Sequence, residues 1–446
     1  MKLLHKLVVV STALCGFPSL LYFKNDNINR SRNERYVWFK DFTPELPPLS
    51  IQKTYDTPKE NSHSHFQKLP NQVEYQVLST TNKTLYRIDP SVLAKARVIY
   101  NFRQSIRTDL KGFDIDWQKS HIPEFGGKPI RNIIISTWRS GSTFFAELVS
   151  SHPGTLLIFE PFMHLESERI RTRGEIPNAI KMSKSIFDCQ FNYTEWTRNS
   201  GDFIFGMISR SDKMKPFCAN VPDGCRDPRF ISKLCKAFPI QLIKFVRFRL
   251  KDAEELLSDE KYDTRLAYLV RDPRGTMKSR NNGSNYWCDH HPDCSDERRL
   301  CADLVDEFAD AKILREKYPT RFKVLRYEDV SLNVELAAKT MLPFFRLSYH
   351  SKVKHFVTLH SRITRKDEFG TYRNSKKTVF SWLNYFLNDV TRLDRIQNYC
   401  KEAMDLWGYK PLDINQFKAE GENYQGNYTL KELVLDRPPW EDMNLS

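Results

Sequence analysis

The residues best suited to binding or catalysis lie in one stretch, between an apolar run and an amphipathic one: Ser136-Thr137-Trp138-Arg139-Ser140-Gly141-Ser142-Thr143-Phe144. A tight turn that leads into a helix N-terminus points several backbone N–H groups at one spot, which then carries positive partial charge. Gly141 lets the backbone approach a ligand closely, and the Ser142 and Thr143 hydroxyls can donate hydrogen bonds. Arg139 adds a full charge on a planar fork. The stretch predicts a phosphate-binding turn, with a capped helix after an ordinary turn as the alternative.

This stretch differs from the nucleotide-binding loop of ATPases and GTPases. That loop has the pattern G-x-x-x-x-G-K-[ST], in which a Lys follows the second glycine. Here no Gly stands five residues before Gly141, no Lys follows it, and the cation Arg139 precedes it. The pattern argues against triphosphate hydrolysis, and a kinase is the weakest of the enzyme alternatives.

A second candidate anion site follows another apolar run and begins with Arg271-Asp272-Pro273-Arg274. Ser279 lies eight residues beyond Arg271, about two helical turns. Parallel α/β sheets bind ligands at the carboxyl ends of their strands, so Arg271 and Ser279 could share one phosphate. An ordinary ion pair between Arg271 and Asp272 is the alternative. Arg373 and Ser375 are candidates for a further phosphate or adenine contact, and a surface loop would explain them equally.

Glu160 is the candidate general base. It ends a predicted strand beside the phosphate turn, and transfer to an alcohol needs a group that takes the hydroxyl proton. A carboxylate among many cations has a depressed pKa and is ionised at neutral pH. A purely structural pair with an Arg is the alternative, and His164 is the reserve base. Lys244 and Arg247, on a neighbouring predicted strand, could contact the transferred group or the acceptor.

The cysteines indicate an oxidising compartment. Cys15 lies in the N-terminal apolar run, and the other eight form an even set whose pairing the sequence leaves open: Cys189, Cys218, Cys225, Cys235, Cys288, Cys294, Cys301 and Cys400. The segment 288–294 also contains two His, so a zinc cluster is conceivable, but disulfides are favoured and no metal is expected. Glycosylation triplets, each a weak signal alone, occur at Asn29, Asn82, Asn192, Asn282, Asn427 and Asn444.

The elements that must position these residues form an alternating pattern. Apolar runs predict strands over 133–135, 156–159, 242–248, 266–270 and 323–327. Apolar residues at helical spacing predict helices over 91–106, 301–317 and 389–407, the last one ended by Gly408. Strands that alternate with helices indicate one α/β domain with a mainly parallel sheet.

The N-terminus predicts entry into the secretory pathway. An uncharged apolar run covers 7–23, at the short end of the roughly 17–25 residues that a membrane span needs. A retained anchor is favoured over a cleaved signal peptide. Polar, proline-containing residues 24–90 follow and read as a stem. The net charge of +14 favours an anionic partner, although a solvated basic surface gives the same sum.

Several motifs together resemble the carbohydrate 6-O-sulfotransferases, which act on galactose, N-acetylglucosamine or N-acetylgalactosamine. They occur in family order: the run Thr137 to Leu148, Phe159-Glu160-Pro161, Leu269 to Gly275 through Ser279, Arg326-Tyr327-Glu328-Asp329, and Thr371-Tyr372-Arg373-Asn374-Ser375 with Trp382. The resemblance extends from about residue 130 to 410. Gly275 stands where an Ala is usual and Asn384 where an Arg is common, and neither departure removes a group that the chemistry needs.

The resemblance implies a P-loop-like sulfotransferase domain with a central parallel sheet flanked by helices. With the N-terminal pattern, it divides the chain into a cytosolic tail, a transmembrane signal-anchor, a stem with the segment leading into the domain, and a luminal sulfotransferase domain: 1–6, 7–23, 24–125 and 126–446. The expected location is the Golgi membrane, single-pass type II. The sequence leaves open whether the chain forms a homodimer.

The resemblance also implies the reaction. The C6 hydroxyl of GlcNAc, Gal or GalNAc in a glycan or proteoglycan would attack the sulfur of the co-substrate PAPS in line, with Glu160 and Arg139 as catalytic residues. No nucleic-acid partner is expected. The alternatives are a non-catalytic glycan-binding protein on the same fold and a sulfotransferase with a non-carbohydrate acceptor. The implied PAPS contacts are Thr137, Trp138, Arg139, Ser140, Gly141, Ser142, Thr143, Phe144, Arg271, Ser279, Arg373 and Ser375.

Overall fold

The computed structural model describes residues 90–420 with gaps at 192–200, 282–285, 290 and 363–373, together with five short strands before residue 87. The chain divides into two compact units, Met1–Asn101 and Phe102–Ser446. The first contains a five-stranded sheet of order β3-β2-β1-β4-β5, built from β1 (Leu7–Ser11), β2 (Ser19–Phe23), β3 (Tyr36–Phe39), β4 (Tyr75–Ser79) and β5 (Lys83–Tyr86).

The apolar run 7–23, which the sequence predicts to span a membrane, contains two of these strands. β1 and β2 pair in the antiparallel sense, with Leu7 opposite Phe23. Among the described residues, no helix combines the length and the apolar character that crossing a membrane requires.

The second unit is built on a five-stranded sheet of order β10-β9-β6-β8-β7, in which every pair of neighbours is parallel. Its strands are β6 (Ile130–Ser136), β7 (Thr155–Phe159), β8 (Ile240–Phe245), β9 (Arg265–Val270) and β10 (Phe322–Arg326). They are apolar along most of their length, as strands covered on both faces must be. The predicted parallel α/β sheet is confirmed, each strand lying within a few residues of its predicted range.

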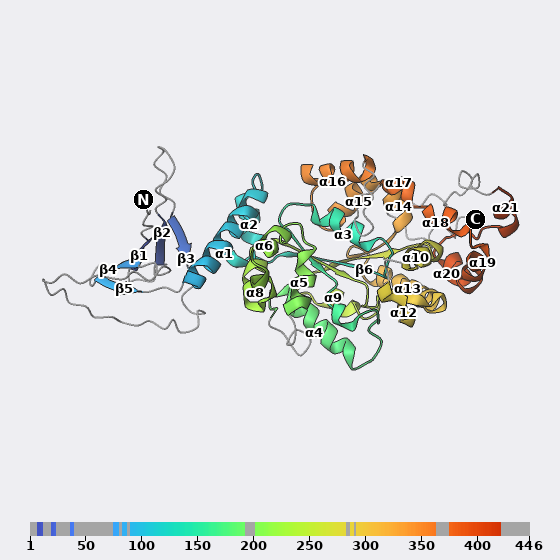
Figure 1. Ribbon diagram of the computed structural model, residues 1–446, viewed down its shortest axis with the longest axis horizontal. Helices are drawn as coiled ribbons and strands as arrows, with labels where there is room; N and C mark the ends of the chain where they lie inside the picture. The colour runs from blue at the N-terminus through green and yellow to red at the C-terminus, as the bar shows by residue number, and fades with distance from the viewer. Residues whose placement is uncertain are drawn as a thin grey trace, which may run out of the picture. The chain divides into compact units, whose positions relative to one another are not determined.

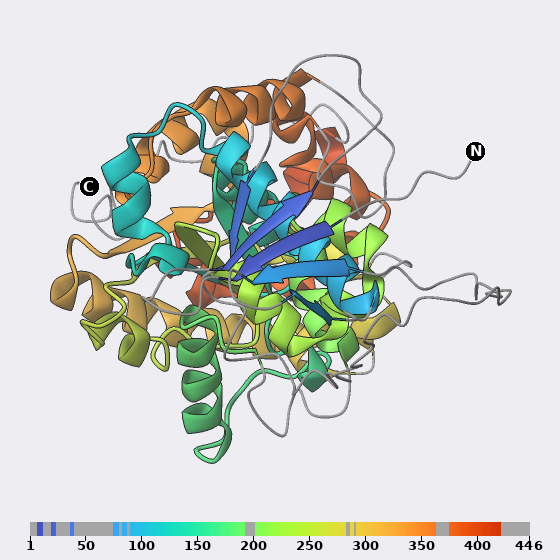
Figure 2. The ribbon, with the colours of Figure 1, turned by 90° about the vertical axis from the view of Figure 1, so that its left-hand side faces the viewer.

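Helices cover both faces of this sheet. Figure 1 shows α3, α15 and α16 on one side and α4, α12 and α13 on the other, and Figure 2 shows the orange α15 and α16 above the sheet and the yellow α12 and α13 below it. The larger helices are α1 (Pro90–Asp109), α2 (Ile115–His121), α3 (Ser142–Ser150), α4 (Glu175–Phe187), α5 (Gly201–Ser209), α8 (Pro228–Cys235), α10 (Pro273–Arg280), α13 (Glu297–Lys317), α15 (Val334–Phe344), α16 (Ser351–Arg362), α19 (Val390–Tyr399) and α21 (Ile414–Glu420). The shorter ones are α6 (Lys215–Asn220), α7 (Pro222–Arg226), α9 (Glu254–Ser258), α11 (Tyr286–Asp289), α12 (Pro292–Ser295), α14 (Tyr327–Leu332), α17 (Ser375–Thr378), α18 (Ser381–Phe386) and α20 (Lys401–Leu406).

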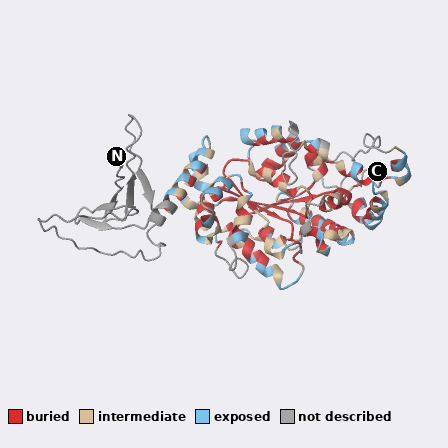
Figure 3. Ribbon diagram, in the orientation of Figure 1, coloured by how far each residue is buried: buried red, intermediate tan, exposed pale blue. Residues whose placement is uncertain are grey.

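The core lies on the two faces of the sheet, where β6 and β8 are buried along their whole length and the other three strands along most of it (Figure 3). On one face Ile134 of β6 packs in a cluster with Phe145 of α3 and Ala337 of α15. On the other face the ring centroid of Tyr268 lies 5.6 Å from that of Trp407. Full burial of one such apolar side chain contributes roughly 1.5–3 kcal/mol, which fixes the helices, and the loops they bound, against the sheet.

Local signals explain where the site's helices begin. Gly141, with φ +85°, precedes the first residue of α3. Asp272 caps α10, because its carboxylate accepts a hydrogen bond from the backbone N–H of Arg274, and Pro273 occupies the first helical position. The predicted helix 389–407 differs: it is divided at Cys400 into α19 and α20.

All eight cysteines outside the N-terminal run form disulfides, as the even count predicts. The bonds are Cys189–Cys235, Cys218–Cys225, Cys288–Cys294 and Cys301–Cys400. Since Cys288 and Cys294 are bonded to each other, the thiolates that a zinc cluster there would need are consumed. The disulfide interpretation of this segment is therefore confirmed.

Candidate active site

The predicted phosphate turn connects β6 to α3 at the carboxyl edge of the sheet. The Ser136 hydroxyl donates to the carbonyl of Leu269 on the adjacent strand (2.6 Å), and the Ser140 hydroxyl donates to the carbonyl of Thr137 (2.8 Å). Gly141 lies against a ring: a Cβ atom there would stand 2.2 Å from Cδ2 of Tyr327. The turn is therefore fixed from both sides. As at any helix N-terminus, the first amides of α3 have no acceptor within the helix.

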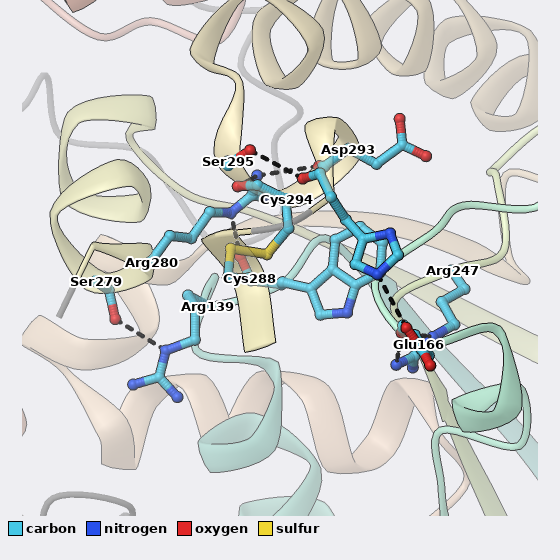
Figure 4. Close-up of a disulfide and its surroundings, with 11 residues drawn as sticks. Arg139, Glu166, Arg247, Ser279, Arg280, Cys288, Asp293, Cys294 and Ser295 are labelled. Atoms are coloured by element: carbon cyan, nitrogen blue, oxygen red, sulfur yellow. Dashed lines mark hydrogen bonds and ion pairs between the residues drawn. A yellow bond between two sulfur atoms is a disulfide. The ribbon is translucent and has the colours of Figure 1, made fainter. Parts of the chain in front are cut away.

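The two candidate anion sites meet at this turn. The Arg139 Nε donates to the Ser279 hydroxyl at 3.1 Å, and Figure 4 shows the two side chains pointing toward each other. The Arg271 guanidinium donates to the carbonyl of Arg139 at 2.8 Å. Arg139 itself adopts φ +64°, a conformation that L-residues rarely occupy. Residues 140 positions apart in the sequence thus converge on one place.

The charge at this place is positive. Asp272 does not neutralise Arg271, because its carboxylate forms an ion pair with Arg274 at 2.7 Å, so the ion pair considered as the alternative is absent here. The buried Nε of Arg271 has no hydrogen-bond partner among the described residues, and its guanidinium lies 4.4 Å from the Tyr327 ring centroid. A buried donor without an acceptor is costly unless a ligand supplies one, which suits an anion such as a phosphate.

Glu160 directly follows β7 at the same edge and is enclosed by cations. Its carboxylate accepts from Lys244 Nζ and, at 2.7 Å, from Arg247. Burial alone would raise the pKa of Glu160, but the charges of Lys244 and Arg247 outweigh it and hold the pKa below its ordinary value. Glu160 is therefore ionised at neutral pH, as the sequence predicts. It also makes the structural pair that the sequence offered as the alternative.

His164 occupies the short helical turn after Glu160. Burial, followed by the charge of Arg247, lowers the pKa of His164 to about 4, so its imidazole is neutral at neutral pH. Arg247 also donates through its Nε to the carbonyl of Glu166 (2.7 Å) and thereby ties the segment after Glu160 to the residues that follow β8. The two cations named from the sequence, Lys244 and Arg247, both contact Glu160.

The other residues that the sequence predicts as nucleotide contacts make contacts of their own within the protein. Trp138 is buried in a cluster with Val246 and the Cys288–Cys294 disulfide, and Phe144 faces the core, its ring centroid 6.0 Å from that of Phe356. The Ser375 hydroxyl donates to the carbonyl of Ser331 (2.7 Å) and holds α17 to α14. Arg373 lies outside the described residues. The remaining turn residues, buried or half-buried, are Thr137, Ser140, Ser142 and Thr143.

Two residues of this site are absent from the sequence-based candidates. Glu328 accepts from the backbone N–H of Asp272 (3.1 Å) and from the Tyr409 hydroxyl (3.0 Å). Burial, and then the charge of Asp272, raise the pKa of Glu328 to about 7. Arg280 donates to the carbonyl of Trp138 (3.2 Å). Glu328 lies within one of the motifs that resemble the family, and Arg280 directly follows another. These positions are the only signal for the two residues in the sequence.

Known proteins resemble this chain at the level of the family, the sequence and the fold. Residues 129–408 match the sulfotransferase domain family. Carbohydrate sulfotransferase 6 of Homo sapiens is 26% identical over 356 residues, which cover 71% of this chain and 87% of that protein. Carbohydrate sulfotransferase 4 of Mus musculus is 25% identical over 349 residues, covering 69% and 87%. A sulfotransferase structure from Mycobacterium avium is 12% identical with a TM-score of 0.32, covering 70% of this chain and 82% of its own.

Proposed function

This chain belongs to the sulfotransferase domain family, and from that premise we propose that it transfers the sulfuryl group of PAPS to a hydroxyl group of a glycan. The observation that carries the proposal is the 3.1 Å hydrogen bond between Arg139 and Ser279. It joins the turn that suits one phosphate to the helix that suits another. A nucleotide with phosphates at two positions needs two such groups at one sheet edge.

The residues at this edge fit such a donor. The first-turn amides of α3, with Arg139, would hold the 5′-phosphosulfate. Arg271 and Ser279 would hold the 3′-phosphate, and the buried Arg271 Nε, which has no partner among the described residues, is available to donate to it. Arg373 and Ser375 remain candidates for contacts with the nucleotide.

The chain's own groups account for the rest of the chemistry. Bound PAPS supplies the sulfuryl group, whose bond to the phosphate oxygen breaks as the bond to the acceptor oxygen forms. Glu160 takes the acceptor's hydroxyl proton, and the ion pair with Arg247 at 2.7 Å keeps the carboxylate aimed and charged. Arg139 and the α3 amides stabilise negative charge on the departing phosphate oxygen, each strong donor contributing roughly 3–4 kcal/mol.

We propose the C6 hydroxyl of GlcNAc, Gal or GalNAc as the acceptor. The names of the 26%-identical and 25%-identical relatives support a carbohydrate acceptor. The quoted motifs support the C6 position through their resemblance to the 6-O-sulfotransferases.

The test is sulfate transfer by the full-length chain from radiolabelled PAPS. The acceptor panel contains GlcNAc-, Gal- and GalNAc-terminated glycans, tyrosine peptides and phenols, and NMR locates the sulfate in the product. We expect transfer to glycans at C6. Transfer only to peptides or phenols would contradict the carbohydrate acceptor, and glycan binding without any transfer would indicate a glycan-binding protein.

We further propose that the domain works in the Golgi lumen, anchored in type II orientation by residues 7–23, which in a membrane would form a helix in place of the paired strands β1 and β2. The four disulfides support an oxidising compartment. Protease protection of the domain in intact microsomes, lost on adding detergent, is the expected result. Digestion without detergent would contradict the orientation, and complete extraction at alkaline pH would contradict the anchor.

A further inference from the structure

Arg280 is a buried cation beside the β6–α3 turn. Within the described part of the chain, its hydrogen bonds go to backbone carbonyl groups. Its side chain donates to the carbonyl of Trp138 (3.2 Å) and to those of Cys294 (2.9 Å) and Asp293 (3.3 Å). Burial, and then the charge of Arg169, lower the pKa of Arg280 to about 9 from the ordinary 12.5. A buried guanidinium that forms three carbonyl contacts fixes the distance between the segments that supply them.

The Cys288–Cys294 disulfide packs against the same turn. It joins α11 to α12, and both cysteines pack with the Trp138 side chain in one buried cluster. Trp138 is therefore held through its carbonyl by Arg280 and through its indole by the disulfide. Figure 4 shows the disulfide and Arg280 next to Arg139 and Ser279.

These contacts adjoin both halves of the candidate donor site. Trp138 precedes Arg139 in the chain and Arg280 follows Ser279, so two neighbouring links, Arg280 to Trp138 and Arg139 to Ser279, join the turn to α10. A shift of the disulfide loop would move Cys294 and release Arg280, and the turn would lose its register with α10. Misplacement of a binding group by about 1 Å can cost up to a hundredfold in rate.

We propose that Arg280 and the Cys288–Cys294 disulfide form a positioning unit that sets the affinity of the site for its bisphosphorylated nucleotide. The unit acts through Trp138, Arg139 and Ser279 and does not itself touch the reacting atoms. The inference rests on the proposed function, since it takes the nucleotide donor as the ligand of this site.

A matched pair of disulfide variants tests this inference. Cys288→Ser/Cys294→Ser opens a bond that spans 6 residues, and Cys218→Ser/Cys225→Ser opens one that spans 7 residues and lies between α6 and α7. In the chain-entropy model the two losses of stability should be nearly equal because the loops are nearly equal. Calorimetry measures the Kd of adenosine 3′,5′-bisphosphate, and thermal unfolding without ligand gives the Tm. Both measurements use the full-length protein.

We expect the 288/294 variant to raise the Kd of this nucleotide by about tenfold or more, and the 218/225 variant to leave it within about twofold. Equal Kd changes in both variants, or no change in either, would overturn the inference and leave the donor assignment intact. Wild-type protein that does not bind the nucleotide would instead overturn the proposed function.

Arg280→Lys provides a second measurement that does not depend on the disulfide. Lys keeps the charge but has a single nitrogen in place of Nε and Nη1, which reach the three carbonyls from two points of the guanidinium. The Kd should therefore rise, with a larger change in the KM for PAPS than in kcat. Arg298→Lys, at an exposed position on α13, is the control. An Arg280→Lys protein that folds and binds like wild type would contradict the positioning role even if the cysteine variants fail to fold.

Discussion

At Glu160 the backbone and the side chain are both fixed by the neighbouring strand. Its backbone N–H donates to the carbonyl of Lys244 at 2.9 Å, and its φ is +46°. Non-glycine residues in this region cost about 1–2 kcal/mol, and they persist where the surroundings impose them, often at functional sites. The backbone hydrogen bond to β8 and the ion pairs with Lys244 and Arg247 impose this conformation and hold the carboxylate at the sheet edge.

The Glu160→Gln variant separates catalysis from donor binding. The amide keeps the shape of the carboxyl group but cannot take a proton, so kcat for sulfate transfer should fall by roughly 100- to 10,000-fold. The Kd for adenosine 3′,5′-bisphosphate should change little. Glu335→Gln, which removes an exposed ion pair with Lys339, is the matched control. An unchanged kcat would refute the role of Glu160 as base.

The pH dependence of the reaction has a defined sign. Burial raises the pKa of Glu160, but Lys244 and Arg247 outweigh it, so the folded pKa lies below the ordinary 4.5. The carboxylate, and its contribution to stability, is fully present above pH 4.5 and is lost as the pH falls through the folded value. We expect the acidic limb of kcat to lie below pH 4.5. A limb near pH 6, with circular dichroism unchanged, would point to another base.

At the scale of elements, the β6–α3 turn depends on a glycine for two separable reasons. Gly141 needs φ +85°, and a Cβ atom there would meet Tyr327. Gly126 has nearly the same φ, +82°, but nothing lies within 4 Å of a Cβ atom there. The two glycines therefore differ mainly in steric contact.

We expect Gly126→Ala to cost about 1–2 kcal/mol of unfolding free energy, the conformational part alone. Gly141→Ala should cost about 1–3 kcal/mol more, because Tyr327 must move, and should also weaken nucleotide binding. Urea unfolding and calorimetry check both effects. Equal losses in the two variants would show that the contact with Tyr327 is unimportant.

Asp293 connects α12 to the segment after β7 through Arg171 (2.8 Å) and to α13 through Arg299 (2.9 Å). Burial would raise the pKa of Asp293, but these hydrogen bonds and the one from the Arg169 N–H lower it to about 2. Its contribution to stability is thus present above the ordinary 3.8 and lost as the pH falls toward 2.

The Asp293→Asn variant should lose roughly 1–3 kcal/mol of unfolding free energy at pH 7. Its difference from wild type should shrink between pH 4 and about pH 2, as wild-type Asp293 becomes protonated. Urea titrations across this range measure the difference, with Asp394→Asn at an exposed position of α19 as the control. A difference that is independent of pH would exclude the ionised carboxylate as its cause.

The sequence predicts local features well and long-range ones poorly. The five strands and the β6–α3 turn depend on neighbouring residues, so periodicity and turn chemistry suffice to find them. The break at Cys400 was not foreseen, because Leu393 and Met404 continue one apolar stripe across it. Arg280 was missed because its importance comes from a carbonyl 142 positions earlier in the chain, which only the fold brings beside it.

At the scale of the whole molecule, the four disulfides differ in how much chain they close. Cys301–Cys400 spans 99 residues and joins α13 to the α19–α20 boundary, while Cys218–Cys225 spans 7. In the chain-entropy model, closing these loops stabilises the folded protein by about 4.7 and about 2.4 kcal/mol, respectively. The long bond holds the C-terminal helices, including the segment with Trp407, against the sheet.

Replacing both cysteines of the long pair by Ala should therefore destabilise the protein by about 2 kcal/mol more than the same change in the short pair. Chemical unfolding of the two double variants under non-reducing conditions measures the difference. A larger loss from the short pair would show that local packing, and not chain entropy, decides what these bonds contribute.

The span of Cys301–Cys400 also has a consequence for biosynthesis. A ribosome adds about 5–20 residues per second, so Cys301 would wait roughly 5–20 s in an oxidising lumen for a partner 99 residues away. During that interval the earlier cysteines are already present as competing partners. Correct maturation then requires that the short bonds close first or that an isomerase reverses mispaired ones, so the yield of correctly folded protein should fall when isomerase activity is limiting.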